Sequence, residues 1–258
     1  MSPWLSVITV VKDDVDGVER TFESLAGQDL DSTQLVVIDG SADRESVLRI
    51  IDGFPDSVDY EWCEPEGIYA AMNRGLTRAR GEFTYFANAG DSLFGDSVFG
   101  YVCELVEGFD WAFGPVEIIE SDGRRVFSPA WDYDVERAAN FSRGHFPSHQ
   151  GTFARTELMR ELGGFDESYR IAADYAMALA LSRISDPVQL PFVVASFYEG
   201  GASTRGWSQA VREFHRARSE ILDPRGVNRV RENVATGVTW ASSWMVREVR
   251  PRLKGAAR

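Results

Sequence analysis

Residues 83–91 read FTYFANAGD, an apolar and aromatic-rich run that stops at a small polar turn ending in a carboxylate. The run from Phe83 to Ala87 is typical of a buried strand, and Asn88 and Asp91 follow it directly. An α/β protein presents oxygen ligands for a hard metal ion in this way, on the turn beyond a strand. Two other strand-like runs of the chain end in the same manner, so this stretch predicts one shared site.

The residues before this stretch alternate between strand-like and helix-like segments. Apolar runs at 5–11, 34–38 and 58–62 indicate strands, and apolar residues at helical spacing mark helices at 18–25, 43–53 and 67–79. The alternation predicts βαβ units and an α/β fold, with a Rossmann-like, mostly parallel central sheet and helices on both faces. Such sheets bind ligands beyond the carboxyl ends of their strands. The polar residues expected there are Lys12, Asp13, Asp39, Glu64, Glu66, Asn88 and Asp91.

After Asp91 the pattern is less regular. We expect a helix at 96–107, a hairpin formed by 111–119 and 125–127, and a loop rich in aromatic residues and proline through 130–148. The segments expected beyond the loop are a strand at 150–153, helices at 155–162 and 173–183, a strand at 188–198, and helices at 207–221 and 227–253.

Composition excludes several classes of protein. The 258 residues carry a net charge of −13, which argues against nucleic acid as a partner because phosphate backbones repel an acidic surface. Residues 205–258 reverse the balance, with 12 basic and 5 acidic residues, and such tails often face an anionic partner. The two cysteines provide no disulfide framework or zinc motif. Because no signal-peptide pattern and no apolar stretch of ~20 residues is present, we expect a cytoplasmic protein.

Seven ordered motifs carry a resemblance to a known family. They are SVITV at 6–10, VIDGS at 37–41, EPEGIYAAMNRG at 64–75, FANAGD at 86–91, SHQ at 148–150, GGFDE at 163–167 and AADY at 172–175. In order and spacing they make the chain resemble glycosyltransferase family 2, from Leu5 to about Ser203. The variant at 64–69 is similar to that of members that build bacterial exopolysaccharides and glycolipids.

The resemblance implies a GT-A fold and an inverting sugar transfer from a nucleotide-diphospho-sugar donor to a hydroxyl of a glycan or lipid-linked acceptor. It divides the chain into a nucleotide-sugar-binding half at 1–110, an acceptor-binding half at 111–205 and a basic helical tail at 206–258. It also implies a divalent metal cofactor, Mg²⁺ or Mn²⁺, which prefers carboxylate oxygen and bridges it to phosphates.

The resemblance also implies roles for particular residues. It implies that Asp91 is the metal ligand and that Asp174 is the catalytic general base, which takes the proton of the acceptor hydroxyl. The residues implied on the nucleotide-sugar side are Thr9, Val11, Asp39, Glu66, Tyr69, Asn73, Asn88, Ala89 and Gly90. Those implied on the acceptor or diphosphate side are His149, Gln150, Asp166 and Ser203.

The residues themselves leave other interpretations open. Asp39 also suits a turn, and Asp91 and Asp174 also suit helix caps. Tyr69 also suits packing in the core, and a lone histidine such as His149 is more often structural than catalytic.

The chain also departs from the family pattern in places. Only the last acid of the family's acidic triplet is present, because residues 88–91 read NAGD. Ala70 stands where many relatives have aspartate, and Asp166 also suits a turn. The depleted triplet leaves open a catalytically silent module that binds a nucleotide or sugar. A sugar-nucleotidyltransferase is less favoured, since the turn at 12–14 lacks a glycine-rich loop with basic residues for a triphosphate.

The basic tail allows three interpretations. Arginines between 225 and 258 interleave with Trp240, Trp244 and Met245, a composition that suits a helix on the anionic inner face of a membrane. The same composition suits a helix packed on the body of the protein, or a contact in a homodimer.

Overall fold

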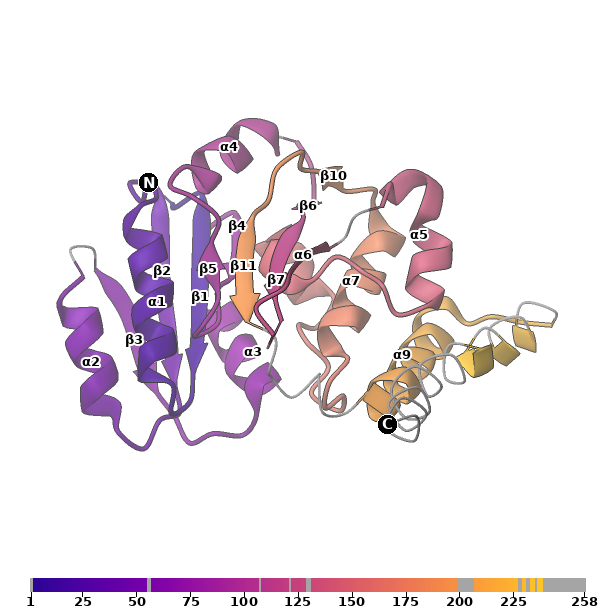
Figure 1. The fold of residues 1–258 in the computed structure, drawn as a ribbon, viewed down its shortest axis with the longest axis horizontal. Coiled ribbons are helices and arrows are strands. Elements are labelled where there is room, and N and C mark those ends of the chain that lie inside the picture. The colour runs from indigo at the N-terminus through magenta and orange to yellow at the C-terminus, as the bar shows by residue number, and fades with distance from the viewer. Residues whose placement is uncertain are drawn as a thin grey trace, which may run out of the picture.

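The computed structural model describes residues 2–54, 57–106, 108–120, 122–128, 131–198 and 207–226, together with 229–230, 233–234 and 236–238. Two sheets with helices packed around them form the described body (Figure 1). The predicted tail residues 241–258 and the predicted site residue Ser203 lie outside the described residues.

The larger sheet has the strand order β10-β6-β9-β4-β1-β2-β3. The strands β1 (Leu5–Val11), β2 (Thr33–Asp39), β3 (Val58–Trp62) and β4 (Phe83–Phe86) run parallel to one another, as the sequence predicts. Strand β9 (Thr152–Arg155) is antiparallel to both β4 and β6 (Trp111–Phe113), and β10 (Val188–Gln189) is parallel to β6. The parallel half therefore presents its carboxyl ends at a single edge.

The smaller sheet has the order β5-β11-β7-β8, formed by Ser92–Leu93, Ala195–Tyr198, Val116–Ile119 and Arg125–Ser128. The predicted strand at 111–119 is wrong as a single element, because β6 belongs to the larger sheet and β7 to the smaller one. Pro115 lies between them and lacks the N–H that would continue a ladder. The predicted strand at 188–198 divides in the same way, around Pro191.

Alternation along the parallel strands separates two apolar layers. Val7 and Val11 face α1 (Val15–Ala26), α2 (Arg44–Asp52) and α4 (Val98–Leu105). Ile8 and Val10 face α3 (Ile68–Arg78), α6 (Thr156–Glu161) and α7 (Ala173–Ile184). Because both faces of the sheet are covered, its strands read as continuous apolar runs rather than alternating ones.

The segment predicted as a loop through 130–148 contains a helix, α5 (Tyr133–Ser142). Asp132 caps it, since its carboxylate accepts hydrogen bonds from the N–H groups of Asp134 and Val135. Tyr133 anchors the helix edge-on against Trp111 of β6. The loop prediction was wrong because the aromatic residues of this segment are buried in the core rather than exposed in a loop.

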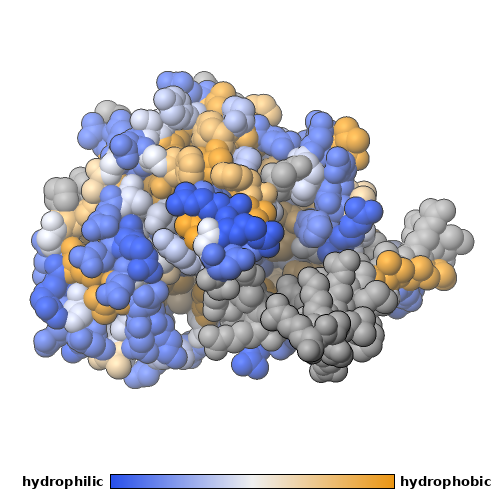
Figure 2. Space-filling model, viewed as in Figure 1, coloured by the Kyte–Doolittle hydropathy of each residue, from blue (hydrophilic) through white to orange (hydrophobic). Residues whose placement is uncertain are grey.

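The helix α9 (Trp207–Leu222) packs on the body of the protein. Phe214, Ile221 and Leu222 contact the apolar layer that contains α7, and Ala217 is fully buried in it. Among the described residues, no helix has both the length and the apolar character that crossing a membrane requires. Exposed apolar side chains gather over α4 on the face seen in Figure 2, where Leu105 is 43% exposed.

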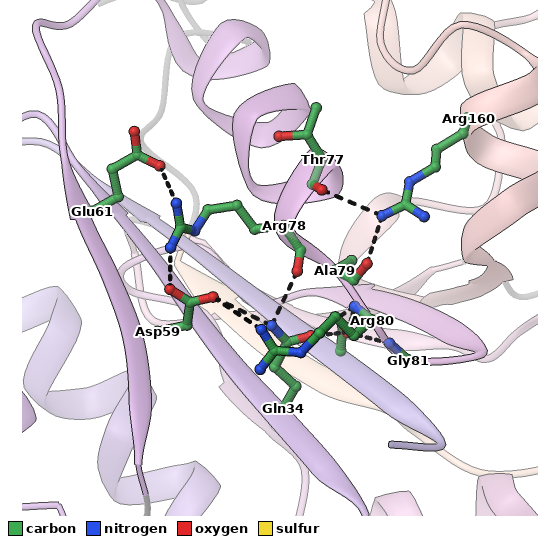
Figure 3. A network of polar contacts seen from close by, with 10 residues as sticks. Gln34, Asp59, Glu61, Thr77, Arg78, Ala79, Arg80, Gly81 and Arg160 are labelled. Carbon is green, nitrogen blue, oxygen red and sulfur yellow. Dashed lines mark hydrogen bonds and ion pairs between the residues drawn. The ribbon is translucent and has the colours of Figure 1, made fainter. Parts of the chain in front are cut away.

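A polar network holds the junction between α3 and β4 at the amino-terminal edge of the sheet (Figure 3). Arg160 of α6 donates to the backbone carbonyls of Leu76 and Ala79, which closes the carboxyl end of α3. Gln34 of β2 accepts from the N–H of Arg80 at 2.7 Å. These bonds fix the entry to β4, and the site lies at the opposite end of the same strand.

Candidate active site

The site forms where β1, β2 and β4 end. The N–H of Gly40, directly after β2, donates to the carbonyl of Val11 at 2.9 Å. On the other side of β1, the N–H of Ala89 donates to the carbonyl of Val10 at 3.1 Å. The predicted residues Val11, Asp39 and 88–90 are therefore brought to the same edge of the sheet.

Asp39 is completely buried at the end of β2. Its Oδ1 accepts from the N–H of Ser41 at 2.7 Å, and its Oδ2 accepts from the hydroxyl of Tyr60 at 2.8 Å. Burial raises the pKa of Tyr60, and the hydrogen bond to Asp39 adds to the effect, so the phenol keeps its proton and remains a donor. Asp39 thus shapes its turn, as the alternative interpretation expects, and its carboxylate is held by a residue of β3.

The turns after β1 and β2 are joined to each other. Asp13 has a positive φ of 55°, and its N–H donates to the Ser41 hydroxyl at 2.8 Å. In return, Asp13 Oδ1 accepts from the N–H of Ala42 at 2.9 Å. These reciprocal bonds fix the loop that follows β1. The loop needs no glycine at the position with positive φ, because aspartate tolerates this conformation better than most residues.

The turn at 88–91 is closed by its own backbone and by α1. Asp91 Oδ2 accepts from the N–H of Asn88 at 3.1 Å, and the N–H of Asp91 donates to the carbonyl of Asn88 at 2.9 Å. Thr21, fully buried on α1, donates to the carbonyl of Asp91 at 2.7 Å and accepts from the N–H of Gly90 at 3.1 Å. Gly90 has φ of 96°, a conformation that other residues rarely adopt.

Asp91 is buried, and burial raises the pKa of its carboxyl to about 6. The neighbouring His149, the N–H of Asn88 and the side chain of Gln150 act in the opposite direction. A carboxyl desolvated in this way gains most from a nearby cation.

His149 lies between the two predicted acids. Its Nε2 is 4.0 Å from Asp91 Oδ2, and its Nδ1 is 3.5 Å from Asp174 Oδ2. Burial lowers the pKa of His149, but the hydrogen bond to Asp174 and the charges of Asp91 and Asp174 outweigh burial and raise it. Asp91, His149 and Asp174 thus form one continuous line of titratable groups.

Asn88 sets the tautomer of His149 when the ring is neutral. Asn88 Nδ2 lies 3.0 Å from His149 Nε2, and the amide nitrogen can only donate, so Nε2 accepts and the proton sits on Nδ1, facing Asp174. Among the described residues the buried Oδ1 of Asn88 has no hydrogen-bond partner. This oxygen is left available to a ligand.

Asp174 occupies the first turn of α7 and not its N-cap, which is Ala172. Its side chain is 18% exposed and contacts His149. Tyr69 lies close by: its hydroxyl donates to the carbonyl of Ile171 at 2.5 Å, and its ring stacks on Phe165. Tyr69 therefore packs, as its alternative interpretation expects, and at the same time touches the segment that leads to Asp174.

Other predicted site residues are engaged elsewhere. Asn73 holds the turn after α6, since its amide donates to the carbonyl of Phe165 at 2.8 Å and accepts from the N–H of Phe165 at 2.7 Å. Asp166 accepts from the N–H of Ser168 in the same turn, and its pKa is lowered mainly by a hydrogen bond with Ser168. Glu66 is exposed before α3. Their roles toward substrates stay predictions.

Two predicted residues act through the backbone or the interior of the sheet. Thr9 is buried within β1, on the face that packs against α1 and α2. The carbonyl of Gln150 accepts from the hydroxyl of Tyr85 at 2.8 Å, which anchors the short helix at 149–151 that carries His149. Sequence reasoning missed Thr21 and Tyr60, the two side chains that hold the turn at 88–91 and Asp39.

A divalent metal fits the residues present at the turn. Nowhere in the described part of the chain do three or more His, Cys, Asp or Glu side chains gather in a metal-binding arrangement. Asp91 nonetheless offers a desolvated carboxylate, and Asn88 offers a buried oxygen without a partner. Mg²⁺ usually takes one or two protein carboxylates and completes its shell with substrate phosphates and water, so this small donor set is sufficient.

The sequence matches a family and several known relatives. The family described as glycosyl transferase family 2 matches residues 6–160. An uncharacterized glycosyltransferase of Mycobacterium tuberculosis (strain H37Rv) is 27% identical over 227 residues, covering 81% of this chain and 80% of the relative. A PGL/p-HBAD biosynthesis glycosyltransferase of Mycobacterium bovis is 28% identical over 213 residues, covering 78% of each chain.

Solved structures share the fold. TarS of S. aureus (residues 1–349, in complex with UDP-GlcNAc) matches with a TM-score of 0.66 at 18% identity, over 84% of this chain and 67% of that one. Against a longer TarS chain the match spans only 40% of its length. A mannosyltransferase of Pyrobaculum calidifontis, in complex with GDP-Man and Mn²⁺, matches with a TM-score of 0.63 at 18% identity, over 100% of this chain and 80% of that one. The chain belongs to glycosyltransferase family 2, and it is a glycosyltransferase with a GT-A fold.

Proposed function

We propose that the chain is an inverting glycosyltransferase that moves one sugar from a nucleotide-diphospho-sugar to a hydroxyl of a glycan or glycolipid. The observation that carries the proposal is the line of side chains from Asp91 through His149 to Asp174. It joins a carboxylate suited to the donor side with a carboxylate suited to the acceptor side. Inversion requires attack and departure on opposite faces of the sugar, and the two carboxylates would serve these two faces.

The donor would lie over the carboxyl ends of β1, β2 and β4. Asp39 is fixed by Ser41 and Tyr60 and would accept hydrogen bonds from the base or the ribose, while Asn88, Ala89 and Gly90 would follow the diphosphate. TarS is described in complex with UDP-GlcNAc, and the mannosyltransferase in complex with GDP-Man. These ligands support the nucleotide-diphospho-sugar class of donor.

Asp91 would hold a divalent metal, with Asn88 Oδ1 as a second ligand. Mg²⁺ or Mn²⁺ bound there would neutralise negative charge on the diphosphate leaving group. The solved mannosyltransferase complex that contains Mn²⁺ supports this cofactor class.

Asp174 would act as the general base. The acceptor oxygen forms a bond to the anomeric carbon, the bond from that carbon to the diphosphate oxygen breaks, and the hydroxyl proton passes to Asp174. In the neutral tautomer, the Nδ1–H of His149 faces Asp174 Oδ2 across 3.5 Å, while the N–H of Tyr175 donates to Asp174 Oδ1 at 2.8 Å and holds the carboxylate. A positioned base contributes about 10²–10⁴-fold in rate.

The acceptor would be a glycan or a lipid-linked glycan. Relatives named for PGL/p-HBAD biosynthesis support a biosynthetic acceptor of this class. The basic residues after 225 would bring the enzyme to an anionic membrane surface on the cytoplasmic side, where a lipid-linked acceptor is available.

Asp174→Asn tests the proposal, because it keeps the size of the side chain and removes its basicity. We expect the turnover of a panel of uridine, guanosine and thymidine diphosphate sugars, measured with Mn²⁺ as released nucleotide diphosphate, to fall at least about 100-fold. Binding of the nucleotide diphosphate, measured by calorimetry, should change less than about threefold because the base does not touch the nucleotide.

Asp186→Asn is the matched control, since Asp186 follows the other end of α7 and pairs with Arg137 on the surface. It should leave both turnover and binding unchanged. Full turnover in purified Asp174→Asn would remove Asp174 as the base. Nucleotide binding by the unaltered chain without turnover of any donor or acceptor would instead support the silent binding module that the depleted acidic triplet leaves open.

A further inference from the structure

The segment that leads into α7 is held by a carboxylate from α9. Glu213 Oε2 accepts from the N–H of Ile171 at 2.8 Å and from the N–H of Ala172 at 3.0 Å. Its Oε1 accepts from the N–H of Arg170 at 3.2 Å. One side chain therefore binds three consecutive backbone N–H groups that lie far from it in the sequence.

The three N–H groups belong to the N-cap residue of α7 and to the two residues before it. Ala172 occupies the N-cap of α7 and makes no side-chain capping bond. Backbone N–H groups that lack partners inside a protein are costly, and residues such as Ser, Thr, Asp or Asn usually provide the partner at a helix start. Within the first turn of α7, the N–H of Tyr175 donates to Asp174 Oδ1 at 2.8 Å. The three N–H groups ahead of that turn have their partner on a separate helix, so the entry into α7 depends on the placement of α9.

Glu213 is well suited to this task. Burial raises the pKa of its carboxyl, but hydrogen bonds from Ile171, Gln209 and the other backbone groups outweigh burial and lower it. The carboxylate is therefore charged at neutral pH, and hydrogen bonds to a charged acceptor are roughly twice as strong as neutral ones.

The same segment is held from its other side. Tyr69 of α3 donates to the carbonyl of Ile171 at 2.5 Å, while Glu213 accepts from the N–H of that residue. Burial raises the pKa of Tyr69, and the charges of Asp174 and Glu213 add to the effect, so the phenol keeps its proton and remains a donor. Residues 170–172 are thus clamped between α3 and α9, and Asp174 lies two positions beyond the clamp.

We propose that Glu213 is a positioning residue that fixes the Asp174 carboxylate by clamping residues 170–172 to α9. The inference rests on the proposed role of Asp174 as the base. Glu213 touches neither donor nor acceptor in this scheme and acts only through the path of the backbone. Because a displacement of about 1 Å at a reacting group can cost about 10²-fold in rate, release of the clamp lowers turnover without weakening nucleotide binding.

The test uses the full chain with two substitutions. Glu213→Ala removes both side-chain oxygens that accept the hydrogen bonds, and Glu213→Gln keeps one of them. The matched control is Glu220→Ala on the same helix, since Glu220 accepts from the Tyr169 hydroxyl at 2.7 Å but contacts no N–H group at 170–172. We expect kcat, measured with Mn²⁺ and the nucleotide-sugar of the panel that is turned over fastest, to fall about 10–100-fold in Glu213→Ala. Glu213→Gln should recover part of the loss.

Two further readouts separate positioning from a merely structural role. Hydrogen exchange of the amides at 170–176 should accelerate in Glu213→Ala and not in Glu220→Ala, while calorimetric affinity for the nucleotide diphosphate stays within about threefold. In the Asp174→Asn background, Glu213→Ala should cost nothing further, because the group that it positions is already absent.

A loss in Glu213→Ala no larger than that in Glu220→Ala would overturn the inference, and so would a full additional loss in the Asp174→Asn background. These outcomes are distinct from failure of the proposed function, which would appear as full turnover in Asp174→Asn alone.

Discussion

Thr21 shows how a single buried hydroxyl supports the site. It lies on α1, donates to the carbonyl of Asp91 and accepts from the N–H of Gly90. Thr21→Val keeps the shape of the side chain but removes the hydroxyl that donates to the carbonyl of Asp91 in the interior, and loss of that buried hydrogen bond costs about 1–3 kcal/mol. We expect a corresponding loss in the free energy of unfolding in urea, and roughly tenfold weaker calorimetric binding of UDP with Mn²⁺ because the turn that carries Asp91 is released.

Ser6→Ala is the control for Thr21→Val. Ser6 is equally buried and binds the N–H groups of Arg80 and Gly81, at the end of the sheet away from the site. It should reduce stability and leave UDP binding unchanged. Unchanged binding in Thr21→Val itself would contradict the role assigned to Thr21.

The residue scale also shows what sequence patterns can predict. Asp39, Asn88 and Asp91 are predictable because they follow strands of a parallel sheet, and the sheet architecture alone places them at one edge. Thr21 is a polar residue on the buried, otherwise apolar face of an amphipathic helix, between Val18 and Leu25. A polar side chain at such a position indicates a functional or structural role that the sequence analysis could have used. Glu213 gives no such signal, because its partners are backbone groups more than 40 positions away.

At the scale of elements, the contact of α3 with the sheet depends on a missing side chain. A Cβ at Gly75 would lie 2.3 Å from Cγ2 of Ile8, so α3 packs closer to β1 than alanine allows. We expect Gly75→Ala to destabilise the protein by about 1–3 kcal/mol in urea unfolding, in spite of the better helix propensity of alanine.

Gly100→Ala in α4 is the matched substitution, since a Cβ there would meet no atom within 4 Å. It should stabilise the protein by about 0.5–1 kcal/mol, because alanine loses less backbone entropy in a helix. A destabilised Gly100→Ala or a stabilised Gly75→Ala would contradict the packing described for these helices.

The elements themselves were predictable to different degrees. Long apolar runs separated by helical spacing predict β1 to β4 and the helices between them, because parallel strands are buried on both faces. Pro115 was a usable signal for a break within 111–119. The assignment of the two parts to different sheets was not predictable, since an apolar run does not indicate which neighbour it pairs with. Helix α5 was missed because the aromatic residues of its segment, among them Tyr133 and Phe141, suggested a loop, whereas the fold buries them.

At the scale of the whole molecule, charge is concentrated toward one end. Residues 227–258 contain seven basic and two acidic residues, whereas the whole chain has a net charge of −13. Each Lys or Arg near an anionic membrane contributes about 1 kcal/mol of attraction. We expect the full chain to co-sediment with vesicles that contain phosphatidylglycerol and not with vesicles of phosphatidylcholine alone.

A chain that ends at Gly226 is the comparison, and it should remain in the supernatant with both kinds of vesicle. Its circular dichroism spectrum checks that α9 persists. Equal sedimentation of the full chain with both kinds of vesicle would contradict attachment to an anionic membrane. The basic residues would then serve in packing on the body of the protein or in a dimer contact.

The clamp on residues 170–172 has a consequence for the order in which the protein is made. Ribosomes add about 5–20 residues per second, so Glu213 is synthesised on the order of ten seconds after Asp91. During that interval a nascent chain can already assemble the parallel strands that would receive the nucleotide, yet the helix that anchors the base does not exist. By the same reasoning, premature release before α9 would yield a protein that binds the donor but turns it over more slowly.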